Sequence, residues 1–162
     1  MEATIALRLP RDAASVPLIR QILEATLNTL GVEEQIRDDI ELMLSEACSN
    51  VIRHAGAGDE YTVSAGVHDD LCVIKVIDMG NGFDPRLVGQ APPEAEHGRG
   101  IQIMRALADD IRFTNRAEHG AVVCLEKRLR FLPGAAASTF MEAEGAAPMN
   151  GEAAGPRPGR PL

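Results

Sequence analysis

Aromatic side chains are scarce in this sequence, which has one Tyr, four Phe and no Trp among 162 residues. We therefore expect an aliphatic core. Proteins that bind single-stranded nucleic acids stack the bases on aromatic side chains, and phosphate backbones attract a concentrated basic face. The formal net charge of −8 opposes such binding. Basic residues cluster only at Lys127, Arg128 and Arg130, and such a strand end is more commonly a solvated face. We expect no direct contact with nucleic acid.

Long apolar runs and paired cysteines are also missing. No stretch of about 18 apolar residues is available to span a membrane, and the first residues lack the basic-then-apolar pattern of a signal peptide. Cys48, Cys72 and Cys124 lie far apart in apolar surroundings. This odd, scattered set favours buried reduced thiols over a disulfide scaffold or a metal site. We expect a cytoplasmic protein with no membrane association.

The remaining composition is that of one globular domain, with 45% hydrophobic and 25% charged residues. Alternating or continuous apolar residues predict strands at 3–9, 61–67, 71–77, 111–115 and 121–130. Helical spacing of apolar residues predicts helices at 15–30, 32–55 and 100–109. We expect Ser15 to cap the first helix and Gly31 to end it.

The ends of the folded region follow from composition. Residues 133–162 contain five of the ten prolines and five glycines, and no apolar stripe can be drawn there. We interpret them as a disordered Pro/Gly/Ala-rich tail, and residues 1–132 as the domain. A second region without periodicity, from Asp78 to Gly100, is expected to be a long loop, either functional or disordered.

Glu46, Asn50 and His54 form the first of three polar clusters. They are spaced four residues apart on the long predicted helix, which places them on one helix face. Apolar residues flank this face, so the carboxylate and the amide lie beside the core and need partners. A bound cation and its ligand would supply those partners. An ordinary polar helix edge is the alternative, and the spacing alone does not favour either.

The second and third clusters are rich in glycine. Asp78 to Gly82 directly follows an apolar strand, where Gly80 and Gly82 leave room for a flat ligand and the aspartate offers an acceptor. Gly98-Arg99-Gly100 precedes a predicted helix, whose free N–H groups, together with the arginine, suit a phosphate. A plain turn or helix cap explains each motif taken singly. Their order along the chain is more specific than any one of them.

In this order the clusters resemble the N, G1 and G2 boxes of the GHKL (Bergerat-fold) ATPases. The helix sequence from Glu46 to Ala55 is similar to the form found in the anti-sigma-factor serine kinases of bacteria. The resemblance covers roughly residues 3–130. It implies an α+β fold: a two-layer α/β sandwich with a mixed, mostly antiparallel sheet of about five strands and helices on one face.

The resemblance also implies ATP and Mg²⁺ as cofactors and a role for each residue. Glu46 would be the catalytic base that accepts the proton of a serine hydroxyl. Asn50 would coordinate Mg²⁺ on the ATP phosphates, and Asp78 would accept a hydrogen bond from the adenine amino group. Arg20 falls where the family places an arginine that contacts partner proteins. The other implied ATP-binding residues are His54, Gly80, Gly82, Gly98, Arg99, Gly100 and Ile101.

By the same resemblance we expect an ATP-dependent protein serine/threonine kinase and anti-sigma factor. It would phosphorylate a STAS-type anti-sigma-factor antagonist and sequester a sigma factor; whether it forms a homodimer stays open. The alternative is a regulatory module that binds ATP and a partner without transferring phosphate. Glu46 favours the kinase, since a pure binder needs no base. One position departs from the family: Gly120-Ala121 replaces the usual Gly-Thr, and the missing hydroxyl would weaken ATP binding by about 1 kcal/mol.

Overall fold

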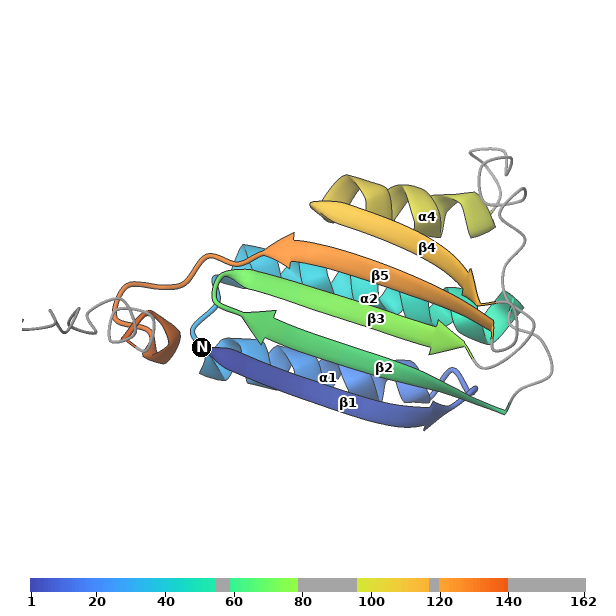
Figure 1. The fold of residues 1–162 in the computed structure, drawn as a ribbon, viewed down its shortest axis with the longest axis horizontal. Helices are drawn as coiled ribbons and strands as arrows, with labels where there is room; N and C mark the ends of the chain where they lie inside the picture. Colours follow the sequence, from blue (N-terminus) through green and yellow to red (C-terminus); the bar gives the residue numbers. More distant parts are fainter. Residues whose placement is uncertain (55–58, 79–95, 117–119, 140–162) are drawn as a thin grey trace, which may run out of the picture.

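The computed structural model describes residues 1–54, 59–78, 96–116 and 120–139 (Figure 1). Its elements follow one another along the chain as β1 (Glu2–Pro10), α1 (Ser15–Thr29), α2 (Glu34–His54), β2 (Glu60–His68), β3 (Leu71–Asp78), α4 (Glu96–Leu107), β4 (Asp110–Arg116) and β5 (Gly120–Arg128). None of the described helices is long and apolar enough to cross a membrane.

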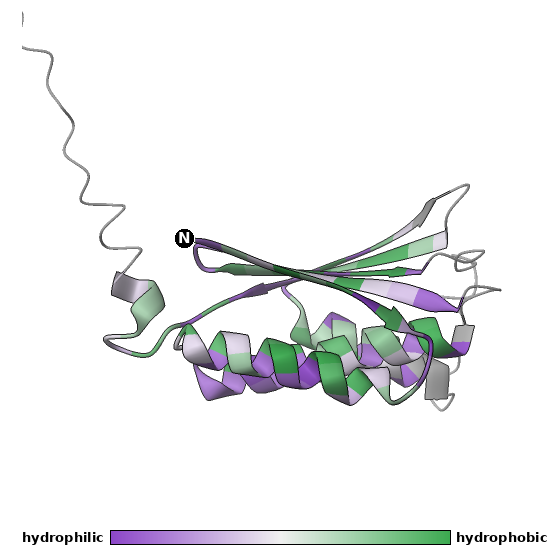
Figure 2. Cartoon of the chain, turned by 90° about the horizontal axis from the view of Figure 1, so that it is seen from below, coloured by the Kyte–Doolittle hydropathy of each residue, from purple (hydrophilic) through white to green (hydrophobic). Residues whose placement is uncertain are grey.

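The strands form one sheet in the order β1-β2-β3-β5-β4, so β3 is its central strand. This position agrees with the continuous apolar sequence of β3, which predicts a strand with neighbours on both sides. The helices lie along one face of the sheet (Figure 2). The α+β, two-layer prediction is therefore confirmed, with one difference. All pairings between the described strands are antiparallel, so this sheet is not mixed.

Aliphatic side chains fill the layer between helices and sheet, as the scarcity of aromatic residues predicts. In β2 every second residue from Tyr61 to Val67 is buried, because alternate side chains of a strand point to opposite faces. In α1 the buried side chains recur at helical spacing, at Ile19, Leu23 and Leu27. α2 packs against α1, α4, β3 and β5, and it is therefore the helix that organises the layer.

Two helix starts differ from the predictions. Ala14 is the N-cap of α1 and makes no side-chain capping bond, whereas the Ser15 hydroxyl is buried and donates to the Asp12 carbonyl at 2.7 Å. α4 begins at Glu96, so the Gly98–Gly100 segment lies inside this helix and not in a turn before it. Packing of α4 against α2 outweighs the poor helix propensity of these glycines. Gly31 ends α1 as predicted, with a φ of +79°.

After β5 the chain crosses the turn between α1 and α2, and we call residues 129–139 the C-terminal strap. Val32 forms a β-bridge with Phe131, and the Leu132 amide donates to the Gly31 carbonyl at 2.8 Å. A helical turn at 136–139 follows, in which Ala137 is fully buried. The described fold thus continues past residue 132, where the tail was expected to begin. Residues 140–162 of that tail lie outside the described residues.

Candidate functional site

Two residues of the first polar cluster lie on the inward side of α2. Asn50 is 6% exposed, and Glu46, one turn earlier, is half-buried. Ala47 and Val51, which flank them, are fully buried. The cluster is thus at the border of the core and not on the solvated side of the helix, as its spacing predicts. His54 is the last residue of α2.

The third cluster lies against the first. A β-carbon built on Gly100 of α4 would come within 2.6 Å of Glu46 Oε2 and 3.8 Å of Glu46 Cβ. The glutamate side chain therefore fills the space that a side chain at position 100 would need. Gly100 is itself buried. Glu46 and Gly100, which are more than 50 positions apart in sequence, are thus neighbours, as the resemblance to an N box and a G2 box around one ligand implies.

Asp78, the start of the second cluster, is 1% exposed and is the last residue of β3. The C-terminal ends of α2 and β3 and the N-terminal end of α4 lie at the same end of the molecule (Figure 1). α2 packs on both of the other elements. The structure therefore places an amide, two carboxylates and a helix N-terminus in one region. Gly80 and Gly82 lie outside the described residues.

The remaining residues of the third cluster open α4. Gly98 and Arg99 belong to its first turn, where the backbone N–H groups have no partner within the helix. The Arg99 side chain is exposed, and Ile101 packs against the hydrophobic core. A helix start with a cation on its solvent side can hold an anion such as a phosphate.

A buried polar group missed by the sequence analysis lies beside Asp78. Tyr61 is paired with Asp78 across β2 and β3, and its hydroxyl lies 2.6 Å from Ser15 Oγ. Burial raises the pKa of Tyr61 to about 12, although the hydrogen bond between Tyr61 and Ser15 opposes the shift. Burial likewise raises the pKa of the Cys48 thiol to about 12, against the opposing effect of its hydrogen bond with Tyr61. These groups stay protonated at neutral pH and hold α1, α2 and β2 together.

The candidate partner-contact residue lies between two helices. Arg20 of α1 forms an ion pair with Glu41 of α2, and its side chain remains 42% exposed. Arg37 and Glu24 form a second ion pair between the same helices. Arg20 is thus held in a fixed direction while part of its guanidinium-bearing side chain stays accessible.

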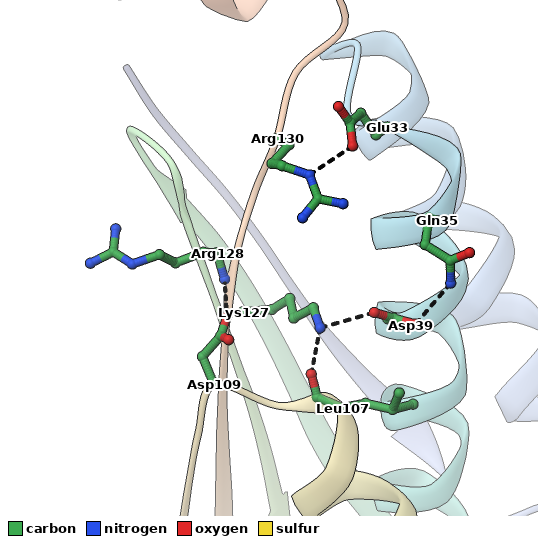
Figure 3. A network of polar contacts seen from close by, with 8 residues as sticks. All are labelled: Glu33, Gln35, Asp39, Leu107, Asp109, Lys127, Arg128 and Arg130. Carbon is green, nitrogen blue, oxygen red and sulfur yellow. Dashed lines mark hydrogen bonds and ion pairs between the residues drawn. The ribbon is translucent and has the colours of Figure 1, made fainter.

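The basic residues near the end of β5 form ion pairs. Arg128 pairs with Asp70 and Arg130 with Glu33, both at 2.8 Å and on exposed positions. Lys127 differs because it points inward, where its Nζ lies 2.9 Å from Asp39 Oδ2 and donates to the Leu107 carbonyl at 2.5 Å (Figure 3). A signal for Lys127 was present in the sequence, since it continues the row of inward-facing residues Val123 and Leu125.

The polar groups of the described residues suit a nucleotide with its Mg²⁺ better than a metal ion held by protein side chains alone. Among the described residues, no group of three or more His, Cys, Asp or Glu side chains could hold a metal ion. The buried amide of Asn50 instead offers one oxygen ligand, which suits Mg²⁺ because this ion keeps most of its ligands from phosphates and water. The space beside Gly100 is taken by the Glu46 side chain, so the absence of a side chain at position 100 lets this carboxylate lie against α4.

Comparison with known proteins gives consistent matches. Residues 9–127 match the sequence family described as "Histidine kinase-like ATPase domain". The chain is 30% identical over 138 residues to "Serine-protein kinase RsbW" of Bacillus cereus (strain ATCC 10987 / NRS 248), covering 78% of this chain and 85% of that protein. The protein of the same name from Bacillus licheniformis is also 30% identical over 138 residues, covering 77% and 85%.

A solved structure shares the fold. The RsbU and RsbW domains of a Mycobacterium tuberculosis protein superpose with a TM-score of 0.61 at 21% identity, covering 80% of this chain and 34% of that one.

Proposed function

Because the chain belongs to the histidine kinase-like ATPase domain family, we propose that it is a protein kinase that transfers the γ-phosphate of ATP to a serine or threonine hydroxyl of a partner protein. The observation that carries this proposal is the contact between Glu46 and the Gly100 position, one helix turn from the buried Asn50. This contact supports the assignment of a carboxylate beside the helix start that would bind phosphate. A kinase needs such an arrangement, whereas an ordinary polar helix edge has no need of it.

Each residue has a distinct task in this proposal. Asp78, at the tip of β3, accepts a hydrogen bond from the adenine amino group. Asn50 holds Mg²⁺, and the first-turn amides of α4 hold the phosphate oxygens together with Arg99. Bound Mg²⁺ supplies positive charge that offsets the charge on the transferring phosphoryl group. Gly80, Gly82, Gly98, His54 and Ile101 stay predicted contacts of the nucleotide.

Glu46 provides the base. As the attacking hydroxyl oxygen forms a bond to the γ-phosphorus, the bond from phosphorus to the bridging oxygen of ADP breaks, and the hydroxyl proton moves to the Glu46 carboxylate. Positioning and charge compensation account for most of the rate in such a transfer, and one positioned base contributes about 10²–10⁴-fold. The contact with Gly100 supports a fixed orientation of this carboxylate.

The proposed partners are those that the resemblance to the anti-sigma-factor serine kinases implies. The relatives named serine-protein kinase RsbW support this choice, and we infer that the substrate is a STAS-type anti-sigma-factor antagonist and that a sigma factor is the alternative partner, in the cytoplasm. Arg20, fixed by Glu41 and 42% exposed, is the proposed contact residue. Replacing it with alanine should weaken capture of the antagonist, whereas Glu41→Gln, which keeps the arginine, should weaken it less.

The alternative is a module that binds ATP without transferring phosphate. Ala121, at the start of β5 and 1% exposed, offers no hydroxyl to a ligand near Asp78, which would weaken ATP binding in either case. Incubation of the purified chain with γ-labelled ATP and candidate antagonist proteins decides between the two. Label on the antagonist supports the kinase; ATP binding without any transferred label supports the module.

A further inference from the structure

Helices α2 and α4 are connected at two places, once by direct contact and once through Lys127 of β5, and the two places are equally spaced along both helices. At one end Glu46 of α2 lies against Gly100 of α4. At the other end Lys127 of β5 joins Asp39 of α2 to the carbonyl of Leu107, the last residue of α4 (Figure 3). Asp39 precedes Glu46 by seven residues, and Leu107 follows Gly100 by seven. The two helices are therefore antiparallel here, and both intervals are about 10.5 Å, two helix turns.

At the Lys127 end of this contact the surroundings favour a positive charge. The side chains of Lys127 and Asp39 are only 12% and 18% exposed, so the ion pair is largely withdrawn from water. The Leu107 carbonyl belongs to the last turn of α4, where carbonyls have no partner within the helix and the helix dipole favours a positive charge. One ammonium group thus satisfies a carboxylate on α2 and a helix end on α4 at once.

The neighbouring backbone strengthens the same attachment. The Arg128 amide donates to Asp109 Oδ2 at 2.6 Å, and the Asp109 amide donates to the Glu126 carbonyl at 2.8 Å. The residues just after α4 are consequently tied to β5 on both sides of Lys127. Met104, between the two contact points, is fully buried. α4 is thereby attached to β5 just beyond its C-terminal end and packed into the core at Met104.

From this geometry we propose that Lys127 is a positioning residue, which sets the register of α4 on α2 and so holds the N-terminal turn of α4 at the Glu46 carboxylate. This inference rests on the proposed function for its effect on ATP, but the register itself does not depend on any nucleotide. If the distal end of α4 is released, the helix can slide or tilt, and the phosphate-binding turn moves away from Asn50 and Glu46.

The test compares Lys127→Met with Arg130→Met in the 162-residue chain. Both remove one cation of an ion pair near the end of β5, but the Arg130 pair is 63% and 36% exposed and joins the strap to the start of α2 instead of to α4. We expect Lys127→Met to raise amide hydrogen exchange in α4, without nucleotide, and to raise the Kd for Mg²⁺-ATP, both by about tenfold. Arg130→Met should change neither by more than about twofold.

A conservative variant and a double variant distinguish a positioning role of Lys127 from a purely stabilising one. Lys127→Arg keeps a cation for Asp39 and the Leu107 carbonyl, and should recover most of the ATP affinity. Asp39→Leu combined with Lys127→Met leaves no unpaired buried charge, so thermal stability should recover, while ATP affinity stays reduced. Recovery of ATP affinity together with stability in this double variant would overturn the proposal. Unchanged exchange of α4 in Lys127→Met would do the same.

The two proposals fail in different ways. A wild-type chain that binds no Mg²⁺-ATP refutes the proposed kinase, yet the exchange of α4 in the nucleotide-free variants still decides the role of Lys127. A wild-type chain that binds ATP, with an equal affinity in Lys127→Met at a temperature where both are folded, refutes only the role of Lys127.

Discussion

The carboxylate of Glu46 occupies the space into which a β-carbon on Gly100 would project, 2.6 Å from Oε2. This relationship joins the long helix α2 to the first turns of α4 at the place where a phosphate is proposed to bind. It also gives the glycine a reason beyond backbone freedom, because α4 is an ordinary helix at this residue. Variants of these and the neighbouring site residues test whether the contact serves nucleotide binding and phosphoryl transfer.

Gly100→Ala should move the Glu46 carboxylate while leaving the fold intact. Alanine is the better helix residue by about 1 kcal/mol, and the atom it meets is the end of a flexible side chain. We expect kcat for phosphoryl transfer to fall at least about tenfold, since a misplaced base costs up to about 10²-fold. Gly66→Ala is the matched control, because its nearest atom, Thr4 Oγ1, is 3.6 Å away. Equal kcat values in both variants would disprove the assignment.

Glu46→Gln and Asn50→Ala should lose different activities. The first keeps the shape of the side chain but cannot accept a proton, so Mg²⁺-ATP should still bind while transfer falls about 10²-fold or more. The second removes the proposed metal ligand, so Mg²⁺-ATP binding itself should be lost. Calorimetric titration and labelled-phosphate transfer measure the two effects.

Asp38→Asn serves as a control for the loss of one charge, since Asp38 is exposed on the same helix. It should retain both activities. If Glu46→Gln and Asn50→Ala lose binding and transfer to the same extent, the two roles are not separate.

Asp78→Asn should relax the selection of the base. An aspartate accepts from the adenine amino group, whereas an asparagine can also donate to the carbonyl that guanine carries at that place. We expect the ratio of Kd values for GTP and ATP to fall toward one, with circular dichroism confirming that the variant is folded, since Asp78 is buried. An unchanged ratio argues that the base is recognised elsewhere.

Alkaline pH should destabilise the fold through its buried thiols. Burial raises the pKa of Cys48 and of Cys72 to about 12, whereas a thiol in the unfolded chain ionises at about pH 8.5. Above that pH the unfolded state has released protons that the folded state keeps, so the free energy of unfolding falls as pH rises toward 12. The expected slope is about 1.4 kcal/mol per pH unit for each thiol.

Urea unfolding in the presence of a reductant, between about pH 8.5 and pH 10, measures this slope. Above that range the raised pKa of Tyr61 adds to it, because an unfolded tyrosine ionises near pH 10. Cys72→Val removes one of the two thiols and should reduce the slope by roughly half. A variant with the wild-type slope would show that other groups control the alkaline transition.

The sequence predicted the order of helices and strands because the apolar periodicity of each element survives in the folded chain. The central place of β3 followed from its unbroken apolar residues, and the inward position of Asn50 followed from its spacing to Ala47 and Val51. The family resemblance, carried by three short motifs, is confirmed over residues 9–127. The individual roles of the site residues stay predictions.

What the sequence did not predict depends on contacts between distant segments. Gly98 and Gly100 indicate a turn by local propensity, and only packing on α2 explains why α4 already begins at Glu96. The inward Lys127 was grouped with its exposed neighbours Arg128 and Arg130, because a charge pattern does not show which side chain finds a buried carboxylate. Ser15 has a residue type suited to capping, but its hydroxyl lies beside Tyr61 instead.

The strap bears on how this protein should be produced and shortened. Gly31 has a φ of +79°, and the methyl group of Ala135 lies 2.3 Å from the position that a β-carbon on residue 31 would take. Expression vectors that stop at residue 132 would strip this cover from the hairpin of α1 and α2, the same pair that carries Arg20 and Glu46. Affinity tags and fluorescent fusions are therefore better joined beyond Thr139.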